Sequence, residues 1–220
     1  GEWRTPFNPR SSNHRNDDYC EGTAWQWTWF VPHDVDGLVE LMGGRDAFIG
    51  KLDSLFTADS KLEGESTSVD ISGLIGQYAH GNEPSHHIAH LYNYVGQPWR
   101  TQEIVDEVLH TLYFNNPDGL SGNEDCGQMS AWYILNAMGF YQVCPGKPVY
   151  SIGRPLFNEA TVHLKDGKSF KVIAHNNSRD NKYVRSIVLN GNKLETPFFT
   201  HQDIVDGGTL ELTMGSEPLK

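Results

Sequence analysis

The chain has 220 residues, which is enough for one large domain or two small ones. Its 28 acidic residues outnumber its 17 basic ones, and the net charge of −11 argues against a nucleic-acid partner, which would need a basic face. No apolar run approaches the roughly eighteen residues of a membrane-spanning helix, and no N-terminal signal peptide is recognisable. Because the chain opens without Met, we expect a processed form, a tagged form or a fragment.

Residues 1 to about 146 show mainly helical periodicity. Asp34 is placed to cap a helix that Gly43 and Gly44 end, and Pro84 and Pro98 suit the first turns of two later helices. Helices are predicted over residues 34–41, 45–55, 84–95, 98–112 and 128–138.

After residue 146 the apolar pattern changes from helical to alternating. Asp166-Gly167 predicts a hairpin turn between two strands, and Asn190-Gly191 predicts a second turn. The predicted fold is therefore mainly α with a β tail. It consists of helical hairpins over residues 1–146, too few to close an (α/α)6 toroid, and a small antiparallel β unit over residues 147–220.

Acidic side chains in glycine- and aromatic-rich loops are the first candidate site residues. Glu124 and Asp125 precede the last helix, Asn82 and Glu83 lie at a similar junction, and Glu21 stands among tryptophans. A helix cap would account for Asp125 completely, whereas free oxygens facing a pocket would make it a general base or a cation ligand. A proton donor needs the apolar neighbours that Glu21 has.

A histidine cluster follows Glu83. His86 and His90 are four residues apart, as in a zincin helix, but His87 stands where the glutamate base of such an enzyme would be. Packing and hydrogen bonding inside a polar cleft is favoured over a zinc site. The three cysteines, Cys20, Cys126 and Cys144, fit no zinc spacing either, and their odd number argues against a disulfide framework.

Four sequence blocks occur in order, and together they identify a family resemblance. They cover residues 21–26 (Glu-Gly-Thr-Ala-Trp-Gln), 30–34 (Phe-Val-Pro-His-Asp), 81–87 (Gly-Asn-Glu-Pro-Ser-His-His) and 122–133 (Gly-Asn-Glu-Asp-Cys-Gly-Gln-Met-Ser-Ala-Trp-Tyr). The blocks resemble the glycoside hydrolase family 92 α-mannosidases, and the β tail is similar to the C-terminal end of that family. Family members are much longer, so the chain resembles their C-terminal portion, without the N-terminal β-sandwich and the first helices of the (α/α)6 barrel.

The resemblance implies an exo-acting, calcium-dependent enzyme that removes α-linked mannose, often α-1,2-linked, from glycans with inversion. It implies that Glu21 is the general acid and Asp125 the general base, and that Asn82, Glu83 and Asp125 lie at the calcium. Thr23 departs from the block, where Asn is frequent. The candidate sugar contacts are Trp25, Gln26, Glu83, His86, His87 and Glu124.

The expected partners are a mannose-containing glycan and the N-terminal portion of the same enzyme, and Ca²⁺ is the expected cofactor. A secreted or periplasmic location of the full-length protein agrees with the family. Two alternatives remain open: a non-catalytic carbohydrate-binding module, which would need the aromatics but no acid–base pair, and a zinc hydrolase that uses His86 and His90. The chain by itself is expected to show little or no hydrolysis.

Overall fold

The computed structural model describes residues 2, 5–14 and 16–220. Helices make up about 31 % of the chain and strands about 23 %, and the strands of the described residues form four sheets. The prediction of a mainly α chain with a β tail, built as part of an (α/α)6 toroid, is therefore wrong. Strands also pair within the first part of the chain, and one predicted helix there is a series of short turns. The predicted boundary at residue 146 stays a prediction.

The first three helices are α1 (Ala24–Trp27), α2 (Val35–Leu41) and α3 (Arg45–Thr57). Asp34 caps α2 as predicted, because its Oδ1 accepts the Gly37 N–H at 3.0 Å. Gly43 and Gly44 follow with φ of 98° and 97°, a backbone conformation that favours glycine, so α2 ends there and α3 begins at once.

The segment predicted as one helix over residues 84–95 is broken into short pieces. It contains two 3₁₀ turns, η1 (Glu83–Ser85) and η2 (Ile88–His90), and the single turn α4 (Leu91–Tyr94). Every residue from 85 to 93 is buried, and the rings of His86 and His87 donate to carbonyl groups of other segments. Tertiary contacts on all sides therefore decide the local backbone, which tightens into 3₁₀ turns.

Two longer helices follow, α5 (Pro98–Thr111) and α6 (Gln128–Met138). Pro98 occupies the first turn of α5, as predicted. Asp125 does not cap α6, so that expectation is wrong: the N-cap residue is Gly127, with φ of 95°. Instead the Glu124 carboxylate accepts the Ser130 N–H at 3.0 Å and the Ser130 hydroxyl at 3.1 Å.

A five-stranded sheet of order β10-β9-β12-β8-β7 dominates the C-terminal part. The predicted hairpin between β7 and β8 is confirmed, and its turn residues Asp166 and Gly167 both have positive φ. However, β12 pairs with β8 in parallel, so the sheet is mixed and the prediction of an antiparallel unit is wrong. The strands are β7 (Glu159–His163), β8 (Ser169–His175), β9 (Tyr183–Leu189), β10 (Asn192–Lys193) and β12 (Gly208–Gly215).

Three smaller sheets complete the fold. The first, of order β11-β6-β5, contains β5 (Phe140–Tyr141), β6 (Val149–Ile152) and β11 (Phe198–Thr200). The others are the pair β1 (Ser11–Asn13) with β2 (Glu63–Ser66) and the hairpin β3 (Leu74–Ile75) with β4 (Tyr78–Ala79). The 3₁₀ turn η3 (Lys165–Gly167) joins β7 to β8, and the short helix α7 (His201–Val205) follows β11. No helix of the described residues is long and apolar enough to cross a membrane.

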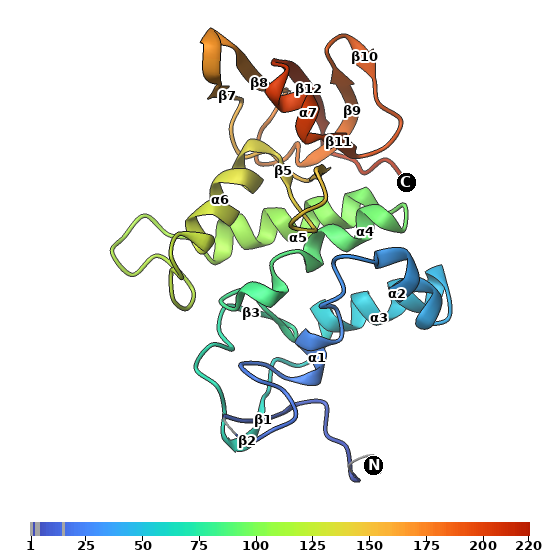
Figure 1. Ribbon diagram of the computed structural model, residues 1–220, viewed down its shortest axis with the longest axis vertical. Helices are drawn as coiled ribbons and strands as arrows, with labels where there is room; N and C mark the ends of the chain where they lie inside the picture. The colour runs from blue at the N-terminus through green and yellow to red at the C-terminus, as the bar shows by residue number, and fades with distance from the viewer. Residues whose placement is uncertain (1, 3–4, 15) are drawn as a thin grey trace.

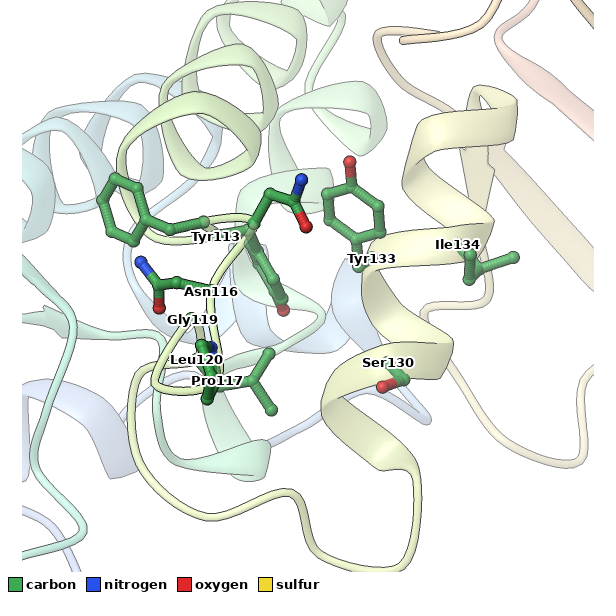
Figure 2. Close-up of a pocket in the computed structure, with 10 residues that line it drawn as sticks. Tyr113, Asn116, Pro117, Gly119, Leu120, Ser130, Tyr133 and Ile134 are labelled. Carbon is green, nitrogen blue, oxygen red and sulfur yellow. The ribbon is translucent and has the colours of Figure 1, made fainter.

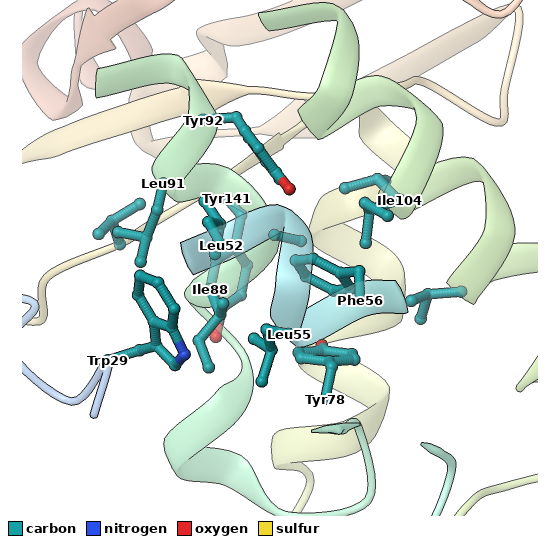
Figure 3. Packing of buried hydrophobic residues seen from close by; sticks show 14 of the residues in the cluster. Trp29, Leu52, Leu55, Phe56, Tyr78, Ile88, Leu91, Tyr92, Ile104 and Tyr141 are labelled. Atoms are coloured by element: carbon teal, nitrogen blue, oxygen red, sulfur yellow. The ribbon is translucent and has the colours of Figure 1, made fainter. Parts of the chain in front are cut away.

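The elements bury two hydrophobic clusters. One lies among the helices, with Trp29, Leu52 and Ile88 at its centre (Figure 3), and the other lies under the five-stranded sheet. Figure 1 shows that sheet at the C-terminal end of the molecule, with α4, α5 and α6 across the middle. Arg154, which follows β6, forms a buried ion pair with Asp106 of α5, with Nε 2.8 Å from Oδ1. The ion pair links the segment after β6 to α5.

Candidate active site

Glycine contacts bring two of the predicted acidic loops together. A Cβ on Gly81 would lie 2.9 Å from the Ser121 carbonyl oxygen, and a Cβ on Gly122 would lie 2.7 Å from the Gly81 carbonyl oxygen. Such contacts are too close for any side chain, so only glycine permits this approach. Because of them, the loop that carries Asp125 lies against the turn that carries Glu83.

The third loop joins the same turn through Asn82, whose side-chain Nδ2 donates a hydrogen bond to the Glu21 carbonyl oxygen. Glu21 has φ of 57°, which a non-glycine residue adopts at a cost of about 1–2 kcal/mol. The backbone is held there by Trp27, whose Nε1 donates to the Cys20 carbonyl at 2.9 Å, while the Glu21 residue itself is exposed. The fold thus presents this carboxylate to solvent on a fixed backbone.

Glu83 and Asp125 form a close carboxyl pair. The pKa of Glu83 is raised, first by burial and then by the charge and hydrogen-bonding contact of Asp125, with a smaller contribution from Asp70. Two carboxyl groups can hydrogen bond only when one carries a proton. One Glu83 oxygen, Oε1, is buried and has no hydrogen-bond partner in the part of the chain that the structure describes.

The structure therefore brings Glu21 and Asp125 to one turn. The Glu21 carbonyl accepts a hydrogen bond from Asn82 of this turn, and the Asp125 carboxyl group contacts Glu83 of the same turn. Asp125 is exposed, with φ of 50°, so its carboxylate is not committed to capping a helix. The general acid and general base roles of Glu21 and Asp125 stay predictions, as do the cation ligands.

The two histidines of the zinc alternative are occupied by hydrogen bonds. His86 Nε2 donates to the His80 carbonyl at 3.0 Å, and its Nδ1 lies 3.2 Å from Gln128 Nε2, which donates to it. His90 Nε2 donates to Asn136 Oδ1 at 2.8 Å, and its Nδ1 lies 3.1 Å from the Ser151 hydroxyl.

Burial lowers the pKa of His86 and of His90 to about 4, so both rings are neutral at neutral pH and serve the fold. Among residues 2, 5–14 and 16–220, no group of three or more His, Cys, Asp or Glu side chains is arranged to hold a metal ion. These hydrogen bonds favour the packing role of both rings over zinc binding, as the sequence predicted.

The predicted sugar contacts have different environments. Gln26 is buried, with its Oε1 2.6 Å from the Thr23 amide and its Nε2 donating to the Gln77 carbonyl at 2.6 Å, so it shapes the Glu21 loop. The Trp25 ring is covered by Lys51, whose Nζ lies 4.3 Å from the ring centroid. His87 is buried and donates to the Trp29 carbonyl at 2.7 Å.

Glu124 also serves the fold, because both of its carboxylate oxygens bond to Ser130 in the first turn of α6. A sugar contact of Glu124 stays a prediction. The same holds for the predicted sugar contacts of Trp25, Gln26, Glu83, His86 and His87.

A buried network behind the acids was missed by sequence reasoning. The Tyr78 hydroxyl donates to His80 Nδ1 at 2.8 Å, His80 Nε2 donates to the Tyr113 oxygen at 2.7 Å, and the Tyr113 hydroxyl donates to the Met129 carbonyl at 3.2 Å. Burial lowers the pKa of His80 and raises that of Tyr78, so the network is neutral. No sequence motif marks Tyr113, whose hydrogen-bond partners are distant in sequence.

Residues 1–216 match the family model described as the glycosyl hydrolase family 92 catalytic domain. The chain belongs to this family. The resemblance seen in the four sequence blocks is thereby confirmed.

Several relatives are similar over most of the chain. The family GH92 α-mannosidase BT3965 of Bacteroides thetaiotaomicron, solved in complex with mannoimidazole, is 42 % identical over 99 % of this chain and 29 % of its own, with a TM-score of 0.92. The inverting mannosidase BT2199 of the same organism is 43 % identical over 99 % of this chain and 30 % of its own, with a TM-score of 0.84. An uncharacterized secreted glycosidase of Arthroderma benhamiae is 32 % identical over 200 residues, which is 90 % of this chain and 24 % of the relative. The chain thus spans less than a third of the length of these relatives.

Proposed function

We propose that this chain is part of an α-mannosidase that hydrolyses α-linked mannosides of glycans. The observation that carries the proposal is the convergence of Glu21 and Asp125 on the turn formed by Asn82 and Glu83. Membership of family 92 and the similarity to an α-mannosidase solved with mannoimidazole support the substrate class. A carbohydrate-binding module would have no need for a proton donor and a base at one turn.

The proposed reaction is a single inverting displacement. Glu21 protonates the leaving oxygen, and Asp125 removes a proton from the water that attacks the opposite face of the sugar ring. Such a pair needs carboxyl groups about 6.5–9.5 Å apart, so that the water fits between them. The exposure of both residues allows a sugar and a water to reach them.

Calcium is the proposed cofactor, with Asn82, Glu83 and Asp125 as ligands. Carboxylate and amide oxygens are the ligands that Ca²⁺ prefers. The unpartnered Oε1 of Glu83 and its crowding by Asp125 and Asp70 fit a cation, because positive charge would relieve both. Ca²⁺ takes about six to eight oxygens, so backbone carbonyls, waters or residues outside this chain would complete the set. When bound, the cation would supply positive charge for hydroxyl groups of the sugar.

Removal of a terminal mannose and a preference for the α-1,2 linkage are the finer parts of the proposal. Both depend on the walls of the leaving-group side, and the rest of the longer protein would supply part of them. The rates of mannose release from α-1,2-, α-1,3- and α-1,6-mannobiose show directly which linkage the enzyme prefers. Equal rates on all three would contradict the α-1,2 preference and leave the mannosidase assignment intact.

The test of the function uses Asp125→Asn and Glu21→Gln in the longer enzyme, with α-1,2-mannobiose and Ca²⁺. Each change should lower turnover at least about a hundredfold, because each removes one proton transfer. Asp118→Asn is the matched control, since Asp118 is an exposed acid of the loop before Gly122. Unchanged turnover in Asp125→Asn would remove Asp125 from its role. Mannan binding without hydrolysis, retained in Asp125→Ala, would support the carbohydrate-binding module instead.

A further inference from the structure

The turn that carries Asp125 has an unusual backbone conformation. Asp125, Cys126 and Gly127 follow one another with positive φ of 50°, 58° and 95°, and α6 begins directly after them at Gln128. Positive φ is unfavourable for the two residues that have a side chain, so it persists only where surrounding contacts hold it. The contacts that hold this turn therefore determine where the Asp125 carboxyl group lies.

The Asp125 carboxyl group has little support of its own. Among the residues that the structure describes, it contacts the carboxyl group of Glu83 and accepts no hydrogen bond from an N–H group. Two ionised carboxylates repel each other, so this contact does not fix Asp125 when both are charged. A base of an inverting pair has to meet a water held between two carboxyl groups, and a displacement of about 1 Å can cost about a hundredfold in rate. The placement of Asp125 therefore depends on the backbone turn.

Glu124 anchors the start of the turn on an exposed side of α6. Its carboxylate accepts the Ser130 N–H at 3.0 Å and the Ser130 hydroxyl at 3.1 Å. Ser130 is exposed and lines a cavity of about 590 Å³ between α6 and the loop of residues 114–120 (Figure 2). Both hydrogen bonds stay within residues 124–130, so they shape the turn without fixing it against another part of the fold.

Gln128 anchors the end of the turn against two distant segments. Its side-chain Nε2 donates to His86 Nδ1 and to the Tyr141 oxygen, at 3.2 Å each. Both partners are buried. The Gln128 backbone N–H also donates to the Asp125 carbonyl at 3.2 Å. One residue therefore joins the turn to the interior of the molecule.

His86 gives Gln128 a fixed acceptor. The ring Nε2 of His86 donates to the His80 carbonyl at 3.0 Å, which leaves the lone pair of Nδ1 for Gln128. The backbone of His86 is held as well, because its N–H donates to the Glu83 carbonyl at 3.0 Å and its carbonyl accepts Trp132 Nε1 at 2.9 Å. The Gln128 amide therefore connects the start of α6 to the turn that carries Glu83.

We infer that Gln128 is a positioning residue for the general base: through its hydrogen bond to His86 it sets where the Asp125 carboxylate meets the attacking water. The inference rests on the proposed role of Asp125 as the general base. Gln128 acts through the turn and not on a reacting atom. Loss of its amide lets the turn move, so turnover falls while the sugar, which other residues hold, still binds.

The test uses Gln128→Met in the longer enzyme, with α-1,2-mannobiose and Ca²⁺. Methionine keeps the length of the side chain without the amide, so kcat should fall about 10- to 100-fold while KM changes less than about twofold. Gln128→Glu is a second variant with the same expected result, because a carboxylate cannot donate to His86. Gln142→Met is the matched control and should match wild type. Gln142 is also half-buried and also donates two hydrogen bonds through Nε2, but to the Cys144 and Lys147 carbonyls.

A second comparison separates positioning from other roles of Gln128. In an Asp125→Asn background the base is already lost, so Gln128→Met should lower the remaining turnover less than about twofold. An equal fold loss in the wild-type and Asp125→Asn backgrounds would show that Gln128 does not act through Asp125, and it would overturn the inference.

Three other results would also overturn the inference. Unchanged kcat in both Gln128 variants would show that the turn is held without the amide. A rise in KM at constant kcat would make Gln128 a direct sugar contact instead. Loss of folded protein in both variants, measured by circular dichroism, would assign Gln128 to the fold alone. In each case a lowered turnover in Asp125→Asn would still support the proposed function, whereas wild-type turnover in Asp125→Asn would overturn both.

Discussion

The Tyr113 oxygen lies 2.7 Å from His80 Nε2, and through this contact the end of α5 connects the two acidic loops. His80 immediately precedes the Gly81–Glu83 turn, and its carbonyl accepts a hydrogen bond from His86. On the other side the Tyr113 hydroxyl donates to the Met129 carbonyl, whose amide in turn donates to the Glu124 carbonyl. The Tyr113 hydroxyl therefore connects the turn that carries Glu83 to the loop that carries Asp125 through hydrogen bonds.

Replacement of Tyr113 by Phe should destabilise the chain by about 1–3 kcal/mol, because the buried His80 Nε2–H loses its acceptor. Urea denaturation measures the change. Tyr133→Phe is the control, since the Tyr133 hydroxyl makes no hydrogen bond to the described residues and its loss should be nearly neutral. Equal stability of the two variants would show that the hydroxyl link does not hold the loops.

The close approach of Gly122 to Gly81 predicts a large effect of a single methyl group. Gly122→Ala should destabilise by about 2 kcal/mol or more, because its Cβ would meet the Gly81 carbonyl oxygen and its φ is 80°. Gly146→Ala has a similar φ of 93° but open space around the added Cβ, so it should cost only about 1 kcal/mol. Thermal unfolding of both variants measures the difference, and equal losses would contradict the close packing of the loops.

Stability should fall in acid because of the buried histidines. The folded-state pKa of His90 is lowered to about 4, below its unfolded value near 6.5. The unfolded chain therefore binds more protons between these values, so the His90 contribution is complete above about pH 6.5 and is lost as pH falls to about 4. The shift corresponds to roughly 3 kcal/mol.

Urea unfolding of wild type and His90→Gln at pH 7 and pH 4 measures this contribution. The variant should lose less stability between the two pH values, because its side chain does not titrate. His163→Gln is the control, as His163 is an exposed histidine of β7. A wild-type pH dependence in His90→Gln would contradict the assignment.

Glu83→Gln should raise stability at neutral pH. The pKa of Glu83 is raised in the folded chain, so its contribution is favourable below the unfolded pKa and is lost as pH rises through the folded pKa. The uncharged amide of glutamine does not ionise, so the variant keeps this stability as pH rises and is not repelled by Asp125. Thermal unfolding at pH 7 should give a higher midpoint than wild type, whereas Glu107→Gln, at an exposed position of α5, should change little. A lower midpoint would show that the Glu83 charge is compensated in the native chain.

Ca²⁺ should stabilise the longer enzyme against thermal unfolding. The Glu83→Gln variant of that enzyme should not be stabilised by Ca²⁺. A ligand that binds only the folded state adds about 2.7 kcal/mol at a hundredfold excess over its Kd. Thermal midpoints with Ca²⁺, with EDTA and with Mg²⁺ measure the effect without reference to activity. An equal calcium response in wild type and Glu83→Gln would remove Glu83 from the proposed ligands.

Local signals predicted the elements whose stabilising contacts are local. Asp34 caps α2 and Pro98 opens α5, because a cap and a first-turn proline act within a few residues. Asp166 and Gly167 form the predicted hairpin turn because their positive φ values follow from residue type. The four blocks of residues also identified the family, since those side chains occur together in sequence.

Contacts between distant segments decided the rest. Residues 84–95 form short turns because burial on every side outweighs helical periodicity. The parallel pairing of β12 with β8, the partners of His86 and His90, and the link from Tyr113 to His80 all join residues far apart in the chain. Sequence pattern reports the preferences of neighbouring residues, whereas which distant groups meet depends on how the whole chain buries its apolar and polar surfaces, and only the folded structure shows that.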